Sequence, residues 1–265
     1  MQIVMLGTGT SHGVPTIDCM LDGYAHCPHR VCEKAATDPR YRRTRASILV
    51  LIDGQYLLID TSQDFREQML ANHVPRIDAV LYTHGHADHI YGLADIRSYC
   101  HQQGGAIDAY GSPETLQTVR DCHNYVFRRP RYEGGGIPAI EAHALTDTGR
   151  VGGVEVTAIP VFHGPLSGCQ GYRFGDTAYI PDVKVIPTES MGLLVGLDLF
   201  ILNCLRVRPH ASHLSLAESL DYATTLKPKR CLFTHMTHDI DFGMHQRGLP
   251  PWISFAYDGQ IVESE

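Results

Sequence analysis

A dense set of side chains that can bind metal follows a short apolar run near residue 80. Three histidines and one aspartate stand within six residues: His84, His86, Asp88 and His89. The run at residues 78–82 predicts a strand that ends in a tight turn, which directs these side chains to one place. Imidazole nitrogens and carboxylate oxygens bind zinc, and also manganese or iron. Because Asp88 lies between two of the histidines, four ligands on one ion would be strained, and we predict two neighbouring ions.

Single histidines and an aspartate recur at the ends of later apolar runs. They are His163 after residues 154–161, Asp182 after residues 177–180, and His235 after residues 229–234. Any one of them alone is more typical of a capping or solvated residue. Their common placement at strand ends favours one shared site, because α/β scaffolds build sites at the edge of a sheet. Asp60, also at a strand end, can orient a metal-bound histidine or simply cap the next helix.

Three cysteines near the start of the chain form a second candidate ligand set. Cys19, Cys27 and Cys32 lie within fourteen residues and supply most of a four-ligand zinc site. The fourth ligand would be His29 or a residue from elsewhere in the chain, and three free thiols are the alternative. The chain does not start like a signal peptide, and no apolar run reaches the ~18 residues of a membrane span. We therefore expect a cytoplasmic protein, in which clustered cysteines are reduced and available for metal.

Composition limits the classes of partner. The 265 residues are 43% hydrophobic and 19% charged, which is ordinary for a soluble globular protein. The net charge of −7 provides no general basic field for a polyanion. Two local arginine clusters could hold phosphate or form a solvated face: Arg40, Arg42, Arg43 and Arg45, and Arg128, Arg129 and Arg131. No linker or short repeat divides the chain, so we expect one domain over residues 1–265.

Strands and helices are expected to alternate along the chain. Predicted strands cover residues 2–6, 47–52, 56–59, 78–82, 107–110, 154–161, 171–174, 177–180, 197–202, 229–234, 252–256 and 261–262. Helical patterns start near residue 64 and at residue 112, and cover residues 90–102 and 216–225. The Asp53-Gly54 dipeptide predicts a hairpin between two of the strands. The segment at 128–138, rich in Gly, Pro and Arg, is either a flap over a site or a surface connector.

Taken together, these ligands resemble the pattern of the metallo-β-lactamase superfamily over essentially the full length of the chain. The resemblance implies an α/β fold, an αββα sandwich of two mixed β-sheets flanked by helices. It implies a first ion held by His84, His86 and His163. It implies a second ion held by Asp88, His89 and His235. Asp182 would bridge both ions, opposite a bridging hydroxide that serves as the nucleophile.

Finer motifs resemble the phosphodiesterase family of the carbon–phosphorus lyase pathway, which cleaves phosphoribosyl cyclic phosphate. They are Gly-Thr-Gly-Thr-Ser-His-Gly-Val-Pro at residues 7–15, the cysteines, Tyr-Arg-Arg at 41–43, and Ile-Asp-Thr-Ser-Gln-Asp-Phe-Arg at 59–66. That family binds a remote structural zinc with three cysteines and a histidine just after the last catalytic histidine. Here Cys19, Cys27, Cys32 and His238 match. An insertion between Cys19 and the next cysteine departs from the pattern and keeps His29 as a substitute ligand.

Ser212-His213-Leu214 resembles the position of that family's catalytic histidine, which is shared with transfer-RNA 3′-processing nucleases. His213 is not a predicted ligand, so it can give a proton to a leaving alkoxide if its pKa lies near neutral. The alternative for His213 is a neighbour of a helix cap without chemistry. We count Asp88 with His213 among the catalytic residues.

We therefore expect a dinuclear metal-dependent hydrolase, a phosphoric diester hydrolase that cleaves a small cyclic phosphate. The expected cofactors are two Zn or Mn ions in the active site and one structural Zn. Two alternatives stay open: an endonuclease that processes transfer-RNA 3′ ends, and a non-hydrolytic member of the superfamily in cofactor biosynthesis. The expected partner is a small phosphodiester and not a membrane. Nucleic acid is not favoured, and a homodimer is left open.

Overall fold

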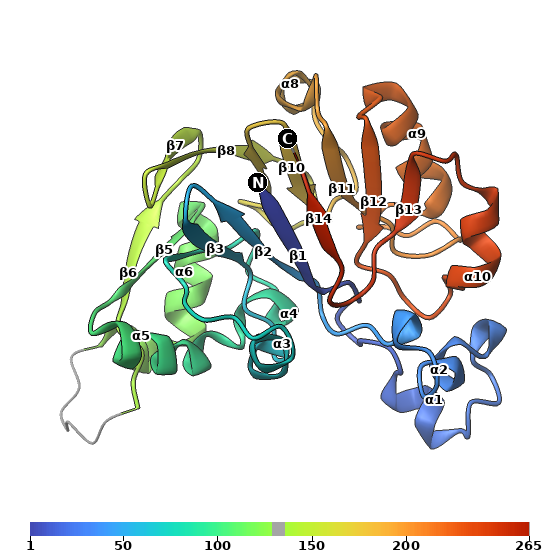
Figure 1. The fold of residues 1–265 in the computed structure, drawn as a ribbon, viewed down its shortest axis with the longest axis horizontal. Coiled ribbons are helices and arrows are strands. Elements are labelled where there is room, and N and C mark those ends of the chain that lie inside the picture. The colour runs from blue at the N-terminus through green and yellow to red at the C-terminus, as the bar shows by residue number, and fades with distance from the viewer. Residues whose placement is uncertain (129–135, 265) are drawn as a thin grey trace.

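Two seven-stranded sheets packed face to face form the centre of the protein. The structure is a computed structural model that describes residues 1–128 and 136–264. Helices cover the outer faces of the two sheets, which gives four layers (Figure 1). The predicted sandwich of two mixed sheets flanked by helices is confirmed.

The two sheets mirror each other in strand direction. In spatial order, the first sheet consists of β14 (Ile261–Glu263), β1 (Gln2–Gly7), β2 (Ser47–Ile52), β3 (Gln55–Ile59), β4 (Ala79–Leu81), β5 (Ile107–Gly111) and β6 (Ile140–Ala144). The second consists of β13 (Ile253–Phe255), β12 (Arg230–Thr234), β11 (Leu199–Asn203), β10 (Thr177–Ile180), β9 (Gln170–Phe174), β8 (Val154–Pro160) and β7 (Thr148–Val151). Strands β3 to β6 pair in parallel, and so do β10 to β13, whereas the remaining pairs are antiparallel.

Short helices connect the strands. The α-helices are α1 (Ile17–Leu21), α2 (Val31–Lys34), α3 (Phe65–Ala71), α4 (Ala87–Ile90), α5 (Arg97–Gln103), α6 (Pro113–Cys122), α7 (Asn124–Phe127), α8 (Thr188–Met191), α9 (Leu216–Leu226) and α10 (Phe242–His245). Single 3₁₀ turns lie at Pro28–Arg30, Pro39–Tyr41, Leu93–Ile96, Gly192–Leu194 and Gln246–Gly248. In residues 1–128 and 136–264, no helix combines the length and the apolar character that crossing a membrane requires.

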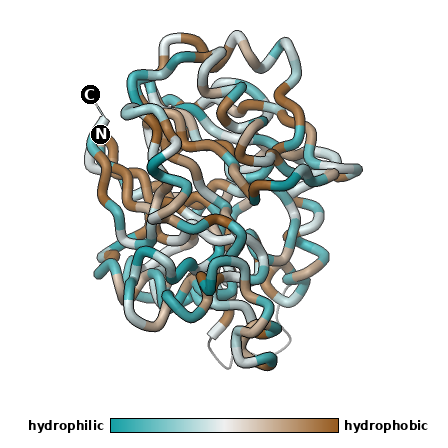
Figure 2. The backbone as a smooth tube through the Cα atoms, turned by 90° about the vertical axis from the view of Figure 1, so that its right-hand side faces the viewer, coloured by the Kyte–Doolittle hydropathy of each residue, from teal (hydrophilic) through white to brown (hydrophobic). Residues whose placement is uncertain are grey.

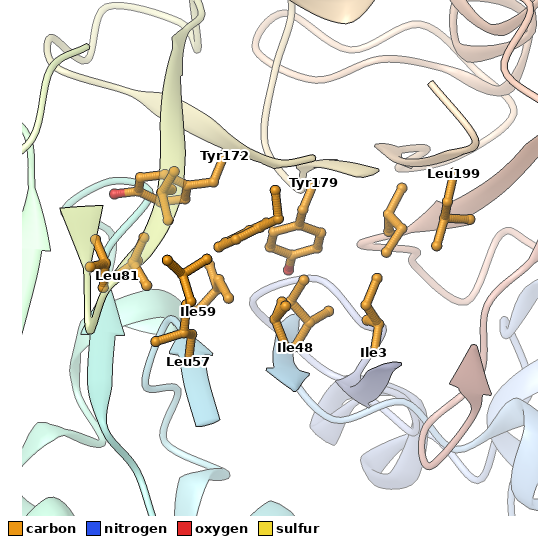
Figure 3. Close-up of a cluster of buried hydrophobic side chains, with 14 of the residues drawn as sticks. Ile3, Ile48, Leu57, Ile59, Leu81, Tyr172, Tyr179 and Leu199 are labelled. Atoms are coloured by element: carbon orange, nitrogen blue, oxygen red, sulfur yellow. The ribbon is translucent and has the colours of Figure 1, made fainter. Parts of the chain in front are cut away.

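Apolar side chains fill three layers of the sandwich. The inner layer lies between the sheets, where residues such as Ile48 and Ile59 of one sheet face Tyr172 and Tyr179 of the other (Figure 3). A second cluster lies under α3, α5 and α6, and a third under α9. In Figure 2 the interior strands are predominantly hydrophobic and the outer loops hydrophilic. A fourth, small cluster joins α1 and α2 through Val14, Cys32 and Tyr41.

The hairpin between β2 and β3 follows the turn chemistry of its sequence. Asp53 and Gly54 both have positive φ, 50° and 76°, and Ile52 pairs with Gln55 across them. A turn with two positive φ angles matches the twist of an antiparallel pair, and Asp-Gly is favoured in it.

Several features differ from the sequence-based expectation, and the short helices α1, α2, α8 and α10 were not predicted. The helix expected over 90–102 is divided into α4, a 3₁₀ turn and α5, because Gly92 donates to the Thr61 carbonyl and leaves the helix. A Cβ at Gly92 would lie 2.0 Å from the Ser62 carbonyl oxygen, so only glycine allows this contact. The edge strands β6 and β7 were not predicted, because both are short and largely solvent-facing and neither contains a buried apolar run.

Candidate metal centre

The strand directions bring the predicted ligands to one edge of the sandwich. Strand β8 runs parallel to β10 because each pairs antiparallel with β9. The turns after β8, β10 and β12 therefore leave the second sheet at the same edge, and they carry His163, Asp182 and His235. The turn after β4 of the first sheet carries the His84–His89 motif to the same place.

The first group of side chains consists of three imidazoles. His84 Nε2 lies 3.0 Å from His86 Nδ1, and His163 Nε2 lies 3.3 Å from the same atom. His84 and His163 are buried, whereas His86 is exposed. The group is therefore open to solvent on the side of His86.

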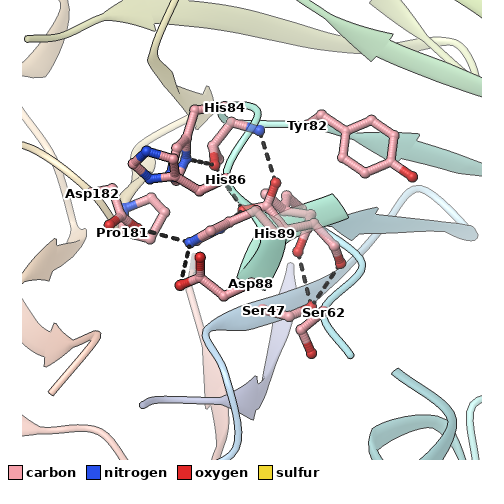
Figure 4. Close-up of polar contacts among 12 residues, drawn as sticks. Ser47, Ser62, Tyr82, His84, His86, Asp88, His89, Pro181 and Asp182 are labelled. Carbon is pink, nitrogen blue, oxygen red and sulfur yellow. Dashed lines mark hydrogen bonds and ion pairs between the residues drawn. The ribbon is translucent and has the colours of Figure 1, made fainter. Parts of the chain in front are cut away.

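The second group contains a carboxylate and two imidazoles. Asp88 Oδ2 lies 3.3 Å from His89 Nε2 and 3.5 Å from His235 Nε2. Asp182 touches both groups, because its carboxylate lies 3.2 Å from His89 Nε2, 3.2 Å from His235 Nε2 and 3.9 Å from His163 Nε2. Figure 4 shows His89 between the carboxylates of Asp88 and Asp182. The structure thus brings together all seven predicted active-site ligands, and their roles as ligands stay a prediction.

Buried polar atoms in this cluster fit a cation. Among the described residues, no hydrogen-bond partner satisfies His89 Nε2, His235 Nε2 or Asp182 Oδ2, although all three are buried. Leaving a buried polar atom without a hydrogen-bond partner costs free energy. Imidazole nitrogens and carboxylate oxygens are common metal ligands in proteins. The imidazole nitrogens and carboxylate oxygens of the cluster lie within 4.8 Å of one another in each group, and such a set of ligand atoms suits a divalent ion.

Charges within the cluster perturb its pKa values strongly. Although burial opposes the shift, Asp88, Asp182 and Asp60 raise the pKa of His89 well above its usual value. Burial also opposes the shift at Asp182, but His235 and His89 hold the pKa of that carboxyl well below its usual range. Against the effect of burial, the same two imidazoles also hold the pKa of Asp88 below its usual range, so both carboxyls are ionised near neutral pH and can serve as anionic ligands.

Hydrogen bonds from outside the cluster orient two of its imidazoles. His89 Nδ1 lies 2.7 Å from Asp60 Oδ2, and Asp60 also accepts from the Thr83 backbone amide at 2.8 Å. Thus Asp60, which could have been a helix cap, contacts His89. His163 Nδ1 donates to the Ser212 carbonyl at 2.7 Å. Partners of this kind set the tautomer of a metal-bound histidine.

The three predicted cysteines meet a histidine from the other end of the chain. His238 Nδ1 lies 3.2 Å from Cys19 Sγ, 3.9 Å from Cys27 Sγ and 3.4 Å from Cys32 Sγ. Tetrahedral zinc separates sulfur and nitrogen ligands by roughly 3.5 Å, so this spacing fits an ion at the centre. The alternative ligand His29 lies elsewhere, with its ring against His245.

Burial alone disfavours the thiolate form of these cysteines. It raises the pKa of Cys32 to about 12 and also raises the pKa of Cys27. A divalent ion reverses this preference because it binds the thiolate form. The group therefore fits one zinc ion with three cysteine ligands and one histidine ligand, and its role as a structural zinc site stays a prediction.

Comparison with known proteins identifies the family. Residues 55–236 match the family described as "Beta-lactamase superfamily domain". The crystal structure of a diphosphatase of the PhnP family superposes with a TM-score of 0.88 and 39% identity, covering 100% of this chain and 98% of that one. The chain belongs to the β-lactamase superfamily. The superfamily predicted from the sequence is confirmed. The resemblance to the phosphodiesterase family of the carbon–phosphorus lyase pathway, which is the PhnP family, is confirmed as well.

Other relatives of this superfamily member have diverse names. An octanoyltransferase of Porphyromonas gingivalis is 34% identical over 98% of this chain and 51% of its own length. A coenzyme PQQ synthesis protein B of Xanthomonas oryzae pv. oryzae is 39% identical over 75% of this chain and 71% of that protein. Zn²⁺-bound PqqB from Methylobacterium extorquens superposes with a TM-score of 0.79 at 22% identity, covering 100% of both chains. The chain spans about half the length of the first curated relatives that it matches, 51% and 42%.

In this superfamily member, His213 lies directly beside the predicted bridging carboxylate. His213 Nδ1 is 3.3 Å from Asp182 Oδ1, and its ring is centred 4.5 Å from that of His163. Burial lowers the pKa of His213 to about 2. This differs from the near-neutral pKa expected from the sequence, because the packing of the loop around His213 was not predictable.

Sequence reasoning did not single out the residues that hold the loop of His213. The Asn203 side chain accepts from the Leu214 amide at 2.8 Å and donates to the Pro181 carbonyl at 2.7 Å. The position of Asn203 directly after an apolar strand was the only available signal. Lys184 donates to the His213 carbonyl at 3.4 Å and to Glu218, and no pattern marked it.

The arginines of the two predicted clusters differ in their contacts. Arg40, Arg42 and Arg45 pair with Asp38, Glu67 and Asp64, so these acidic neighbours already engage the guanidinium groups. Arg43 is buried and donates to backbone carbonyls. In the second cluster, Arg129 and Arg131 lie outside the described residues, as does most of the predicted flap.

Proposed function

We propose that this chain is a metal-dependent hydrolase, and specifically a phosphodiesterase that cleaves small cyclic phosphates. The observation that carries this proposal is the position of His213. A histidine outside the predicted ligand set lies 3.3 Å from the shared carboxylate of Asp182, where a leaving group could receive a proton. A site that only hydrolysed activated amides or thioesters would not need this residue.

Each side chain has a distinct task in the proposed reaction. His84, His86 and His163 would hold one ion, Asp88, His89 and His235 the other, and Asp182 both. When bound, two divalent ions supply a Lewis acid and a water of lowered pKa for attack on phosphorus. Asp60 and the Ser212 carbonyl keep His89 and His163 in the required tautomers.

His213 would act only once substrate is present. Its imidazole is neutral in the free protein because burial lowers its pKa to about 2. The negative charge of a bound phosphodiester favours the protonated form and so raises this pKa. We infer that His213 is then protonated and donates its proton to the leaving alkoxide.

The names of the relatives support phosphate chemistry and also supply a second candidate. The PhnP-family neighbour with 39% identity is a diphosphatase, which favours a diphosphate linkage as the alternative substrate. Relatives named coenzyme PQQ synthesis protein B support a role of this chain in cofactor biosynthesis as a further candidate function. We do not propose octanoyl transfer, because this chain spans only 51% of the relative that has that name.

A substrate panel tests the proposal. Purified protein supplied with Zn²⁺ or Mn²⁺ would be offered ribose cyclic phosphates, cyclic nucleotides, linear diesters, diphosphates and a transfer-RNA precursor. We expect the highest kcat/KM on a small cyclic phosphate, and loss of turnover in Asp182→Asn. Preference for diphosphates would favour the second candidate. Turnover of the transfer-RNA precursor alone, or of no substrate, would overturn the proposal.

A further inference from the structure

Among the residues that the structure describes, no carboxylate contacts the buried guanidinium of Arg43. Its side chain is 1% exposed, and its guanidinium donates to the backbone carbonyls of Thr237 at 2.6 Å and Ile240 at 2.7 Å. Within the described part of the chain, its Nε has no hydrogen-bond partner. A buried charge is costly unless an opposite charge lies nearby.

The two carbonyls that Arg43 contacts flank His238. Residues 235–240 carry a predicted ligand of each metal centre, because His235 faces the active site and His238 faces the cysteines. Within this segment, the amide of Met236 bonds to the Thr8 carbonyl at 2.9 Å, and the amide of Thr237 bonds to the Leu205 carbonyl at 2.8 Å. The guanidinium of arginine is planar and has five N–H donors, so it can donate to two carbonyls at a fixed separation. The compact ammonium group of lysine does not have this geometry.

The occupied cysteine site would supply a further opposite charge. Three thiolates, one neutral imidazole and a divalent ion carry a net single negative charge. Arg43 reaches this site through the carbonyls of Thr237 and Ile240, which lie on either side of His238 in the chain. The carboxylates of Asp258 and Asp241 also interact with Arg43, but neither forms a hydrogen bond or ion pair with it.

We propose that Arg43 is a positioning residue that couples the two metal centres. It balances the charge of the occupied cysteine site and holds the turn at 237–240, which fixes His238 and, through the same segment, His235. This inference rests on the proposed cysteine metal site, but not on the identity of the substrate.

The backbone of Arg43 extends the coupling to the cysteines themselves. Its amide and carbonyl pair with Val14 at 2.9 Å and 2.8 Å, two residues before Thr16, whose amide lies 3.5 Å from Cys32 Sγ. Gly9 lies against the same residue, since a Cβ there would come within 2.8 Å of the Arg43 carbonyl oxygen. The glycine-rich turn at 7–13 therefore packs closely against Arg43.

Cobalt titration of the metal-stripped protein tests this role. Only the cysteine site gives a thiolate-to-cobalt absorption band, so the band reports that site separately from the imidazole and carboxylate cluster. We expect Arg43→Gln to weaken cobalt binding at this site by about 10- to 100-fold, the range seen when a partner of a metal ligand is lost. Arg43→Lys, which keeps the charge without the fork, should lie between Arg43→Gln and the wild type. Arg42→Lys is the matched control, because among the described residues the side chain of Arg42 pairs only with the exposed Glu67.

The outcomes separate this inference from the proposed function. Equal cobalt affinity in Arg43→Gln and in the wild type would overturn the role of Arg43. Absence of the band in the wild type would overturn both the cysteine site and this role, but would leave the phosphodiesterase proposal to its own panel. If Arg43→Gln does not fold, amide hydrogen exchange on the wild type decides. We expect faster exchange at 236–240 after release of cobalt from the cysteine site, and unchanged exchange would contradict the coupling.

Discussion

His213 differs from the ligands around it because it would move a proton and not bind an ion. Its ring is buried beside Asp182, and burial holds its pKa at about 2 in the free protein. A proton donor matters most when the leaving group is a strong base, since a weakly basic leaving group departs without protonation.

The first prediction concerns the leaving group in His213→Gln. We expect kcat to fall by about 10²- to 10⁴-fold on a diester with an alkyl leaving group, and much less on bis-(p-nitrophenyl) phosphate. Steady-state rates with the two substrates measure the difference. An equal loss on both substrates would show that His213 acts on binding or folding and not as the acid.

The second prediction concerns Asp60, which contacts His89 from outside the predicted ligand set. Asp60→Asn replaces the carboxylate that lies 2.7 Å from His89 Nδ1 with a neutral amide, which is a weaker acceptor, so the tautomer of the imidazole is held less firmly. We expect metal affinity of the active site to fall by about 10- to 100-fold, measured by competition with a chromophoric chelator.

Asp108→Asn is the control for Asp60, because it breaks another aspartate–histidine pair, 2.9 Å long but exposed, at His143. We expect Asp108→Asn to leave metal affinity unchanged. A similar loss in both variants would mean that the effect is not specific to the hydrogen bond on His89.

At the level of elements, Asp258 joins three segments that support the site. In the turn before β14, it accepts from the Thr8 hydroxyl at 2.7 Å and from the Thr44 amide and hydroxyl at 2.6 Å and 2.7 Å. These contacts tie the end of β1 to the segment that leads into β2. Burial raises the pKa of this carboxyl to about 6.

The third prediction follows from the sign of that shift. A carboxyl with a raised folded-state pKa favours folding while it is protonated, and this contribution is lost as the pH rises through the folded value. Between about pH 4 and pH 6, the wild type should therefore lose about 2 kcal/mol of unfolding free energy relative to Asp258→Asn. The full shift would give about 3 kcal/mol, and partial solvation of the carboxyl reduces it.

Urea unfolding of both proteins at a series of pH values measures this difference. The substitution itself changes the free energy of unfolding by an amount that does not depend on pH. Only the variation of the difference with pH therefore tests the raised pKa. A difference between the two proteins that does not vary from pH 4 to pH 6 would contradict the raised pKa.

Elements that contain apolar runs and ligand motifs were predictable, and elements shaped by tertiary contacts were not. Strand β2 has the predicted bounds, and the turns after β4, β8, β10 and β12 carry the predicted ligand residues. The break at Gly92 depends on contact with Ser62, which no local pattern encodes. The choice of His238 over His29 similarly required the turn at 237–240, and the pKa of His213 required the packing of its loop.

At the level of the molecule, the fold places the two predicted metal centres at the ends of one short segment. His235 and His238 are three residues apart, yet His235 faces the predicted active-site ligands at the edge of the sandwich and His238 faces the cysteines near α1 and α2. The central claim is that a pair of ions in the first centre carries out hydrolysis, while the second centre has a structural role.

Stepwise reconstitution of the metal-stripped protein tests that claim most directly. Zn²⁺ or Mn²⁺ would be added in known ratios to the chain, and hydrolysis of a ribose cyclic phosphate would be measured at each ratio. The account predicts three ions per chain at saturation, with little turnover while only the cysteine site is filled and full turnover after two further ions are bound. Full turnover in the stripped protein, or with a single ion per chain, would contradict it.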